Sequence, residues 1–152
     1  MPGTIAGTVR QFIETHRVGR LATVDSSGHP AVIPVCFAYD GTALYSAIDA
    51  KPKQVPPERL QRIRNIQENP YVSLLIDDYS ENWNELAYVQ IRGTADIIEP
   101  DSSIASAHRR AVAALRLKYA QYRSMSIDQS WVIRILPDRV HVWSADGHLR
   151  IG

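Results

Sequence analysis

The chain has 152 residues, of which 45% are hydrophobic and 22% are charged, as in an ordinary folded domain. Its 17 basic and 16 acidic residues nearly balance, which argues against a nucleic-acid protein held by phosphate neutralisation, because such proteins carry a marked basic excess. The single cysteine, Cys36, excludes an internal disulfide and a cysteine-based metal site. No stretch approaches the roughly 18 apolar residues of a membrane span, and no signal-peptide core is evident, so we expect a soluble, cytoplasmic protein.

Taken in chain order, the hydrophobic periodicity and the turn signals predict an alternation of helices and strands. Residues 4–16 have apolar side chains at helical spacing, with Thr4 as the N-cap. Asp40-Gly41 is a strong hairpin signal between two of the predicted strands. Gly93 lies within a long strand and indicates a bulge. The predicted strands are residues 20–25, 30–39, 42–48, 71–77, 85–98, 131–136 and 139–143.

Two further helices are predicted between these strands. Residues 58–68 form an amphipathic helix that Asn69-Pro70 ends, because the residue before a proline avoids helical geometry. Residues 102–122 form the longest helix. Most strands are joined by hairpins rather than by crossovers, so the pattern predicts an α+β fold, an antiparallel barrel or curled sheet with about seven strands and three helices. Residues 1–152 are expected to form a single domain.

A basic cluster is the most informative local feature, because five cations fall within residues 51–64 of an otherwise neutral chain. On a helical wheel Arg59 falls inside the apolar arc, and Arg62 lies at its edge. A guanidinium on the buried side of a helix is costly unless an anion meets it. We therefore predict that Arg59, Arg62 and Lys53 converge on one anion, and a phosphate suits the planar guanidinium. The alternative is a solvated basic face, which fits Arg64 better.

Aromatic residues provide a second indication of a site, whereas familiar catalytic motifs are absent. Trp83 lies in a predicted polar loop, where tryptophan typically packs on another subunit or a ligand, although capping of the barrel is the alternative. The sequence has no phosphate loop, dinucleotide fingerprint or nucleophile elbow. Its five histidines are dispersed, with no pair at ligand spacing on one element, so no metal site is predicted.

Several segments resemble the pyridoxamine 5'-phosphate oxidase-like split β-barrel superfamily, and within it the actinobacterial oxidoreductases that use the deazaflavin coenzyme F420. The matching segments are residues 18–24, 28–30, 51–53, 62–66 and 69–75, together with Trp83 and Gly93. The resemblance implies an FMN-binding split β-barrel that works as a homodimer, with the cofactor in a groove at the subunit interface. The cofactor phosphate would lie toward the basic helix and the ring system against the second and third strands.

The resemblance also assigns cofactor-binding positions. Lys53 and Arg62 match the family's phosphate-binding cations, whereas the role of Arg59 rests on the helical wheel alone. Trp83 and Tyr88 match aromatic positions that reach the cofactor site of the partner subunit, and Tyr88 is a candidate catalytic proton donor to the reduced substrate. The full set of expected cofactor-binding residues is Lys53, Arg59, Arg62, Val35, Cys36, Phe37, Trp83 and Tyr88.

The implied activity is an F420-dependent transfer of a hydride between the deazaflavin and an unsaturated organic substrate. Pyridoxamine 5'-phosphate oxidases proper carry an Arg-Lys pair in the helix and a glutamine near the start of the long strand. This sequence has Gln61-Arg62 and Tyr88 there, which disfavours vitamin B6 oxidase activity. Two alternatives stay open: an FMN-dependent oxidoreductase of the same fold, and a flavin- or haem-binding protein without catalytic turnover.

Overall fold

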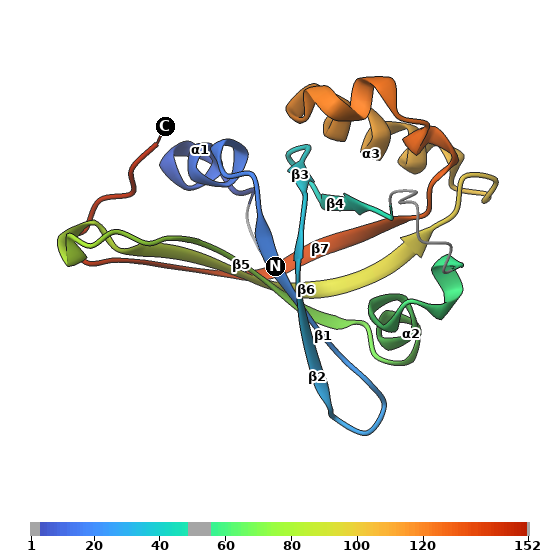
Figure 1. Cartoon of the computed structure of the whole chain (residues 1–152), viewed down its shortest axis with the longest axis horizontal. Coiled ribbons are helices and arrows are strands. Elements are labelled where there is room, and N and C mark those ends of the chain that lie inside the picture. Colours follow the sequence, from blue (N-terminus) through green and yellow to red (C-terminus); the bar gives the residue numbers. More distant parts are fainter. Residues whose placement is uncertain (1–3, 49–55, 152) are drawn as a thin grey trace.

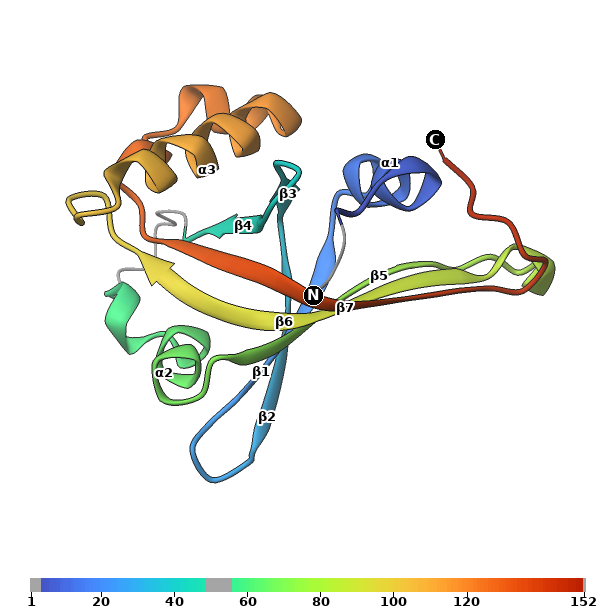
Figure 2. The same ribbon diagram turned by 180° about the vertical axis from the view of Figure 1, so that it is seen from behind.

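The computed structural model describes residues 4–48 and 56–151 and contains one strongly curled antiparallel sheet. The strand order is β2-β1-β5-β6-β7-β4-β3, and Figures 1 and 2 show β1 and β2 crossing the direction of β6 and β7. This confirms the predicted α+β split β-barrel with seven strands and three helices. The strands are β1 Gly19–Val24, β2 Pro30–Val35, β3 Ala38–Tyr39, β4 Leu44–Ala47, β5 Tyr71–Asp78, β6 Ala87–Ile98 and β7 Val132–Ser144.

The three α-helices cover different parts of the sheet. Helix α1 (Gly7–Thr15) lies beside β3, α2 (Gln61–Glu68) packs on β1 and β6, and α3 (Ala105–Lys118) covers β3 and β4. In Figure 1, α1 and α3 lie above the sheet and α2 lies below it. Among the described residues, no helix is long and apolar enough to cross a membrane.

The number of strands agrees with the sequence, but two boundaries between them differ. The predicted strand 30–39 is two strands, because it is interrupted at Cys36 and Phe37, where the Phe37 N–H donates to the Tyr119 hydroxyl at 3.0 Å. Conversely, the predicted strands 131–136 and 139–143 are one strand, β7, which continues through Pro137. A bulge between Arg92 and Gly93 accommodates this proline and confirms the predicted irregularity at Gly93.

Helix boundaries are the other point of difference. Helix α1 begins at Gly7, and its N-cap residue is Ala6, whose side chain makes no cap hydrogen bond, so the prediction of Thr4 as N-cap is wrong. Helix α3 is shorter than predicted because a 3₁₀ turn from Ala120 to Ser124 follows it. The predicted end of α2 is confirmed, because the helix stops at Glu68 immediately before Asn69-Pro70.

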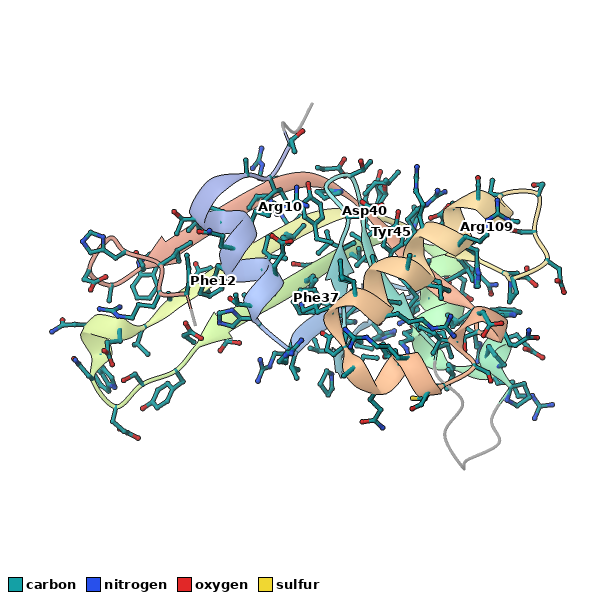
Figure 3. All side chains as sticks on the ribbon, turned by 90° about the horizontal axis from the view of Figure 1, so that it is seen from above. Arg10, Phe12, Phe37, Asp40, Tyr45 and Arg109 are labelled. Atoms are coloured by element: carbon teal, nitrogen blue, oxygen red, sulfur yellow. The ribbon has the colours of Figure 1, made fainter. Side chains whose placement is uncertain are left out.

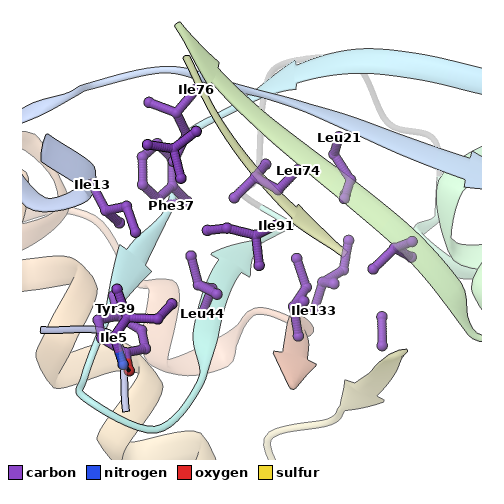
Figure 4. Packing of buried hydrophobic residues seen from close by; sticks show 14 of the residues in the cluster. Ile5, Ile13, Leu21, Phe37, Tyr39, Leu44, Leu74, Ile76, Ile91 and Ile133 are labelled. Carbon is purple, nitrogen blue, oxygen red and sulfur yellow. Dashed lines mark hydrogen bonds between the residues drawn. The ribbon is translucent and has the colours of Figure 1, made fainter. Parts of the chain in front are cut away.

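Two hydrophobic clusters hold the fold together. The larger lies inside the curled sheet and is closed by α1 and α2, and Figure 4 shows Leu21, Leu74 and Ile91 meeting there. The smaller one lies between α3 and the strands β3 and β4 and includes Tyr45 and Leu115. The Asp40-Gly41 hairpin between these strands is confirmed. The Asp40 carboxylate accepts from the N–H groups of Thr42 and Ala43 at 2.8 and 2.9 Å.

Candidate functional site

Helix α2 is fixed on the sheet by a buried polar contact as well as by apolar packing. The Asn65 side chain, 1% exposed, donates to Thr23 Oγ1 on β1 at 2.9 Å and accepts from the Gln61 side chain at 2.6 Å. On the same helix face, Ile63 and Ile66 are buried in the larger core. Because both types of contact fix the rotation of the helix, the direction in which Arg62 leaves it is also fixed.

Arg62 is half-buried and lines a pocket of about 160 Å³ together with Val35 and Cys36. The other residues that line this pocket are Val18, Pro34, Ser46, Ala47 and Tyr122. The structure thus brings together three of the predicted cofactor-binding residues, which come from α2 and from the end of β2. A guanidinium beside a strand end and an apolar wall can hold an anionic group of a ligand while an attached flat body lies along the strand.

The two other predicted cations do not extend this cluster within the described residues. Lys53 lies outside the part of the chain that the structure describes. Arg59 belongs to a 3₁₀ turn, Pro57–Arg59, and is exposed. Helix α2 begins only at Gln61, so the wheel argument that placed Arg59 on the buried face is wrong, because it assumed a helix starting at residue 58.

Phe37 is a core residue whose backbone is already bonded. Its side chain is 1% exposed, and its N–H donates to the hydroxyl of Tyr119, which also lies 3.0 Å from the Phe37 carbonyl oxygen. Desolvation by burial raises the pKa of Tyr119 to about 12, so this phenol stays protonated. Tyr119 therefore fixes the β2–β3 connection beside the pocket. The sequence places Tyr119 only within the predicted helix 102–122, because a contact across 82 residues leaves no local signal.

Trp83 and Tyr88 lie far from Arg62 in the same subunit. Figure 1 shows the β5–β6 turn at one end of the molecule and α2 at the other. Trp83 is 68% exposed on this turn. Tyr88 stacks on Trp143 of β7 with ring centroids 5.8 Å apart, and it lines a separate surface pocket of about 430 Å³ with Leu75 and Asp77. Within one chain, these aromatic residues therefore do not lie beside Arg62.

The fold and the pocket beside α2 define a split β-barrel protein with a candidate cofactor site. The sequence profile of the pyridoxamine 5'-phosphate oxidase family matches residues 5–144, and the chain belongs to this family. A curated relative, the 5a,11a-dehydrotetracycline/5a,11a-dehydrooxytetracycline reductase of Streptomyces rimosus, is 28% identical over 145 residues. These residues cover 93% of this chain and 84% of the relative.

Solved structures show the same fold at low sequence identity. A conserved hypothetical protein of Mycobacterium tuberculosis superposes with a TM-score of 0.70 at 20% identity, covering 100% of this chain and 96% of that protein. The haem storage protein of Vibrio cholerae gives a TM-score of 0.65 at 17% identity, with coverages of 90% and 91%. A protein described as an F420 reductase gives 0.61 at 23% identity, with coverages of 90% and 98%.

Proposed function

We propose that the protein is an F420-dependent oxidoreductase that works as a homodimer. In this proposal it transfers a hydride between the deazaflavin and an unsaturated organic substrate. The observation that carries the proposal is the half-buried guanidinium of Arg62, fixed beside the end of β2. The family resemblance matches this residue to a phosphate-binding cation. The similarity to a reductase over most of the chain supports a redox function.

The size of the pocket supports a site that two subunits complete. Its volume of about 160 Å³ is below the roughly 300–1,000 Å³ of small-molecule sites, so it holds only one part of a deazaflavin, such as the phosphate. The remaining walls must come from elsewhere. The exposed aromatic residues Trp83 and Trp143 are suited to covering a ligand bound to the partner subunit, because tryptophan is enriched at such interfaces.

In this proposal the bound deazaflavin supplies the hydride chemistry, and the protein supplies binding and orientation. Arg62 binds the phosphate, and the backbone of Val35 and Cys36 forms the wall beside the ring. Tyr88 remains the proposed proton donor, acting on a substrate held across the subunit interface. Phe37 acts indirectly, because its peptide groups keep the β2–β3 connection in place through Tyr119.

The FMN alternative is tested by titrating the purified protein with F420 and with FMN side by side. We expect saturable F420 binding and at least about tenfold weaker FMN binding, a difference of about 1.4 kcal/mol. Protein purified from a host without F420 should be colourless. A yellow protein that retains FMN would instead support the flavin alternative. Tight F420 binding without oxidation by any unsaturated acceptor would support a binding protein without turnover.

Replacing Arg62 with alanine should weaken F420 binding by about 1.5–3 kcal/mol, because a charge-assisted bond to the phosphate is lost. Isothermal titration with F420 measures this change. Arg64→Ala is the matched control, since Arg64 lies on the same helix but is exposed. An unchanged dissociation constant in Arg62→Ala, or an equal loss in both variants, would remove Arg62 from the proposed phosphate site.

Replacing Trp83 with alanine should weaken the dimer or cofactor binding but leave the fold of the subunit intact, because the side chain is largely exposed. Sedimentation velocity and F420 titration measure the first effect, and far-UV circular dichroism measures the second. Tyr71→Ala is a suitable control, since Tyr71 is 67% exposed at the opposite end of β5. Unfolding of the Trp83→Ala subunit would show that Trp83 caps the barrel instead.

A further inference from the structure

A cavity larger than the Arg62 pocket lies between α1 and α3, above the β3–β4 hairpin. Its volume is about 580 Å³, and Arg10 and Glu14 of α1 face Arg110 and Lys118 of α3 across it. Figure 3, viewed from above, shows Arg10 on α1 and Asp40 in the β3–β4 turn between α1 and α3. None of its lining residues lines the pocket of Arg62, so the cleft is a separate feature of the molecule.

The two carboxylates of the cleft already have partners. Glu14 pairs with Arg10 at 3.2 Å on the surface of α1. Asp40 accepts from two backbone N–H groups and from the Tyr45 hydroxyl at 2.7 Å, and its carboxylate lies 3.9 Å from the Arg110 guanidinium. These bonds hold the pKa of Asp40 below its usual value although burial opposes the shift. Asp40 is therefore ionised, and both acids already have partners.

Lys118 forms no ion pair with a carboxylate of the described residues. Its Nζ donates to the Ile13 carbonyl oxygen at 3.2 Å and lies 3.7 Å from the centre of the Phe37 ring. Across residues 4–48 and 56–151, no carboxylate oxygen lies within 4.0 Å of this nitrogen. Burial, with a smaller effect of Arg17, lowers the pKa of Lys118 to about 7. Within the described residues, a charged ammonium at this place therefore has no ion-pair partner, although Glu14 acts on it from a longer distance.

Beside these charged groups, the cleft has an apolar wall and is large enough for a ligand. Ala38, Ala113 and Ala114 line its walls with methyl groups, and Leu117 lies at the rim with 81% of its side chain exposed. The volume falls within the range of small-molecule sites, which combine apolar walls with a few polar groups that fix orientation. A ligand that fits has an apolar body and a single negative charge.

We propose that the cleft between α1 and α3 binds a small carboxylic acid with an apolar body, whose carboxylate pairs with Lys118. The carboxylate supplies the close ion-pair partner that no described carboxylate provides, and the apolar body covers the alanine walls and Leu117. The site is independent of the proposed cofactor site, because the two share no residue. Phe37 is the nearest link between them, since its ring lies under Lys118 and its backbone follows Cys36.

Octanoate and 1-octanol test this proposal, because they share an apolar body and differ in the charge. By isothermal titration we expect octanoate to bind about tenfold more tightly than 1-octanol, the effect of one charge-assisted pair in a partly desolvated site. Lys118→Met should reduce octanoate affinity to that of the alcohol while 1-octanol binding stays unchanged. Arg109→Met is the control, since Arg109 lies on α3 and does not line the cleft; it should change neither affinity.

A second variant locates the site without removing the lysine. Ala113→Trp places a large side chain at an exposed position of the cleft wall and should abolish binding of both ligands while the fold stays intact. Equal affinities of octanoate and 1-octanol for the unmodified protein would overturn the proposal. So would octanoate binding that survives Ala113→Trp, or that survives Lys118→Met in a folded protein.

Discussion

Gly93→Ala is expected to lower the free energy of unfolding by about 3 kcal/mol or more, because the added methyl group would collide with backbone atoms. A Cβ at Gly93 would lie 2.2 Å from the Leu136 carbonyl oxygen and 3.2 Å from the Pro137 Cα. Neither atom can rotate away as a side chain would. The collision can be relieved only if β6 and β7 move apart at the bulge beside Pro137.

Chemical denaturation of both proteins measures this loss, and Gly28→Ala is the informative control. Gly28 has a positive φ of 85°, but a Cβ there would meet no atom within 4 Å. The Gly28→Ala substitution should lower the free energy of unfolding by only about 1 kcal/mol, through backbone strain. Gly93, by contrast, does not have a positive φ, so its larger cost would come from contact alone. A loss at Gly93 no greater than that at Gly28 would show that the bulge relaxes around the new side chain.

The same glycine illustrates what the sequence predicts well. A lone glycine in a long apolar strand indicates a bulge, and the structure has the bulge there. The sequence did not reveal the reason, which is the approach of Pro137 from a strand 44 positions later in the chain, since the register pairs Gly93 with Pro137. A proline in a strand pattern normally argues for a break, and for that reason β7 was predicted as two strands.

Local patterns also predict that a helix is present, and where it ends, better than they predict its first residue. Asn69-Pro70 fixed the end of α2, because proline restricts the residue before it. Nothing comparable fixed its start, where Pro57–Arg59 forms a 3₁₀ turn. The predicted helix started three residues too early. For this reason Arg59, which is exposed, was predicted to lie on the buried face of the helix. Arg62 lies within the helix in both cases, so its predicted place at the edge of the buried face agrees with its half-buried position.

The pocket of Arg62 was predictable only through the family resemblance, which supplies the topology that brings α2 beside β2. Periodicity alone gives no reason for Arg62 and Cys36 to meet. The cleft between α1 and α3 was not predicted at all. A lysine in the last turn of a helix is typical of a solvated residue that interacts with the helix dipole, whereas Lys118 extends over Phe37 toward α1.

Lys118→Met is expected to remove a pH dependence of stability from the protein. The pKa of Lys118 falls from its usual 10.5 to about 7 on folding. Between these values the unfolded chain binds a proton that the folded chain does not, so the free energy of unfolding should rise with pH. The full pKa shift would correspond to a rise of the free energy of unfolding on the order of 5 kcal/mol. Because the side chain is only half-buried, solvent screening reduces the expected difference to about 1–3 kcal/mol.

The measurement is the free energy of unfolding of both proteins between about pH 6 and pH 10. Groups that are common to both proteins and do not interact with Lys118 cancel in the difference. The pH range ends near 10 because unfolded tyrosines begin to ionise there. The folded pKa values of Tyr45 and Tyr119 are raised to about 12, so the stability of both proteins falls as the pH rises above about 10. Parallel curves for the two proteins would show that Lys118 is solvated in solution.

Octanoate connects this pH dependence with the proposed cleft. A carboxylate beside Lys118 favours its charged form, so a saturating ligand should raise the pKa of the amine toward its usual value. The rise in stability above pH 7 should then become smaller in the unmodified protein and stay unchanged in Lys118→Met. By linkage, octanoate affinity should fall as pH rises through the pKa of Lys118, since the neutral amine offers no counter-charge. An octanoate affinity that is constant over this pH range would place the carboxylate away from Lys118.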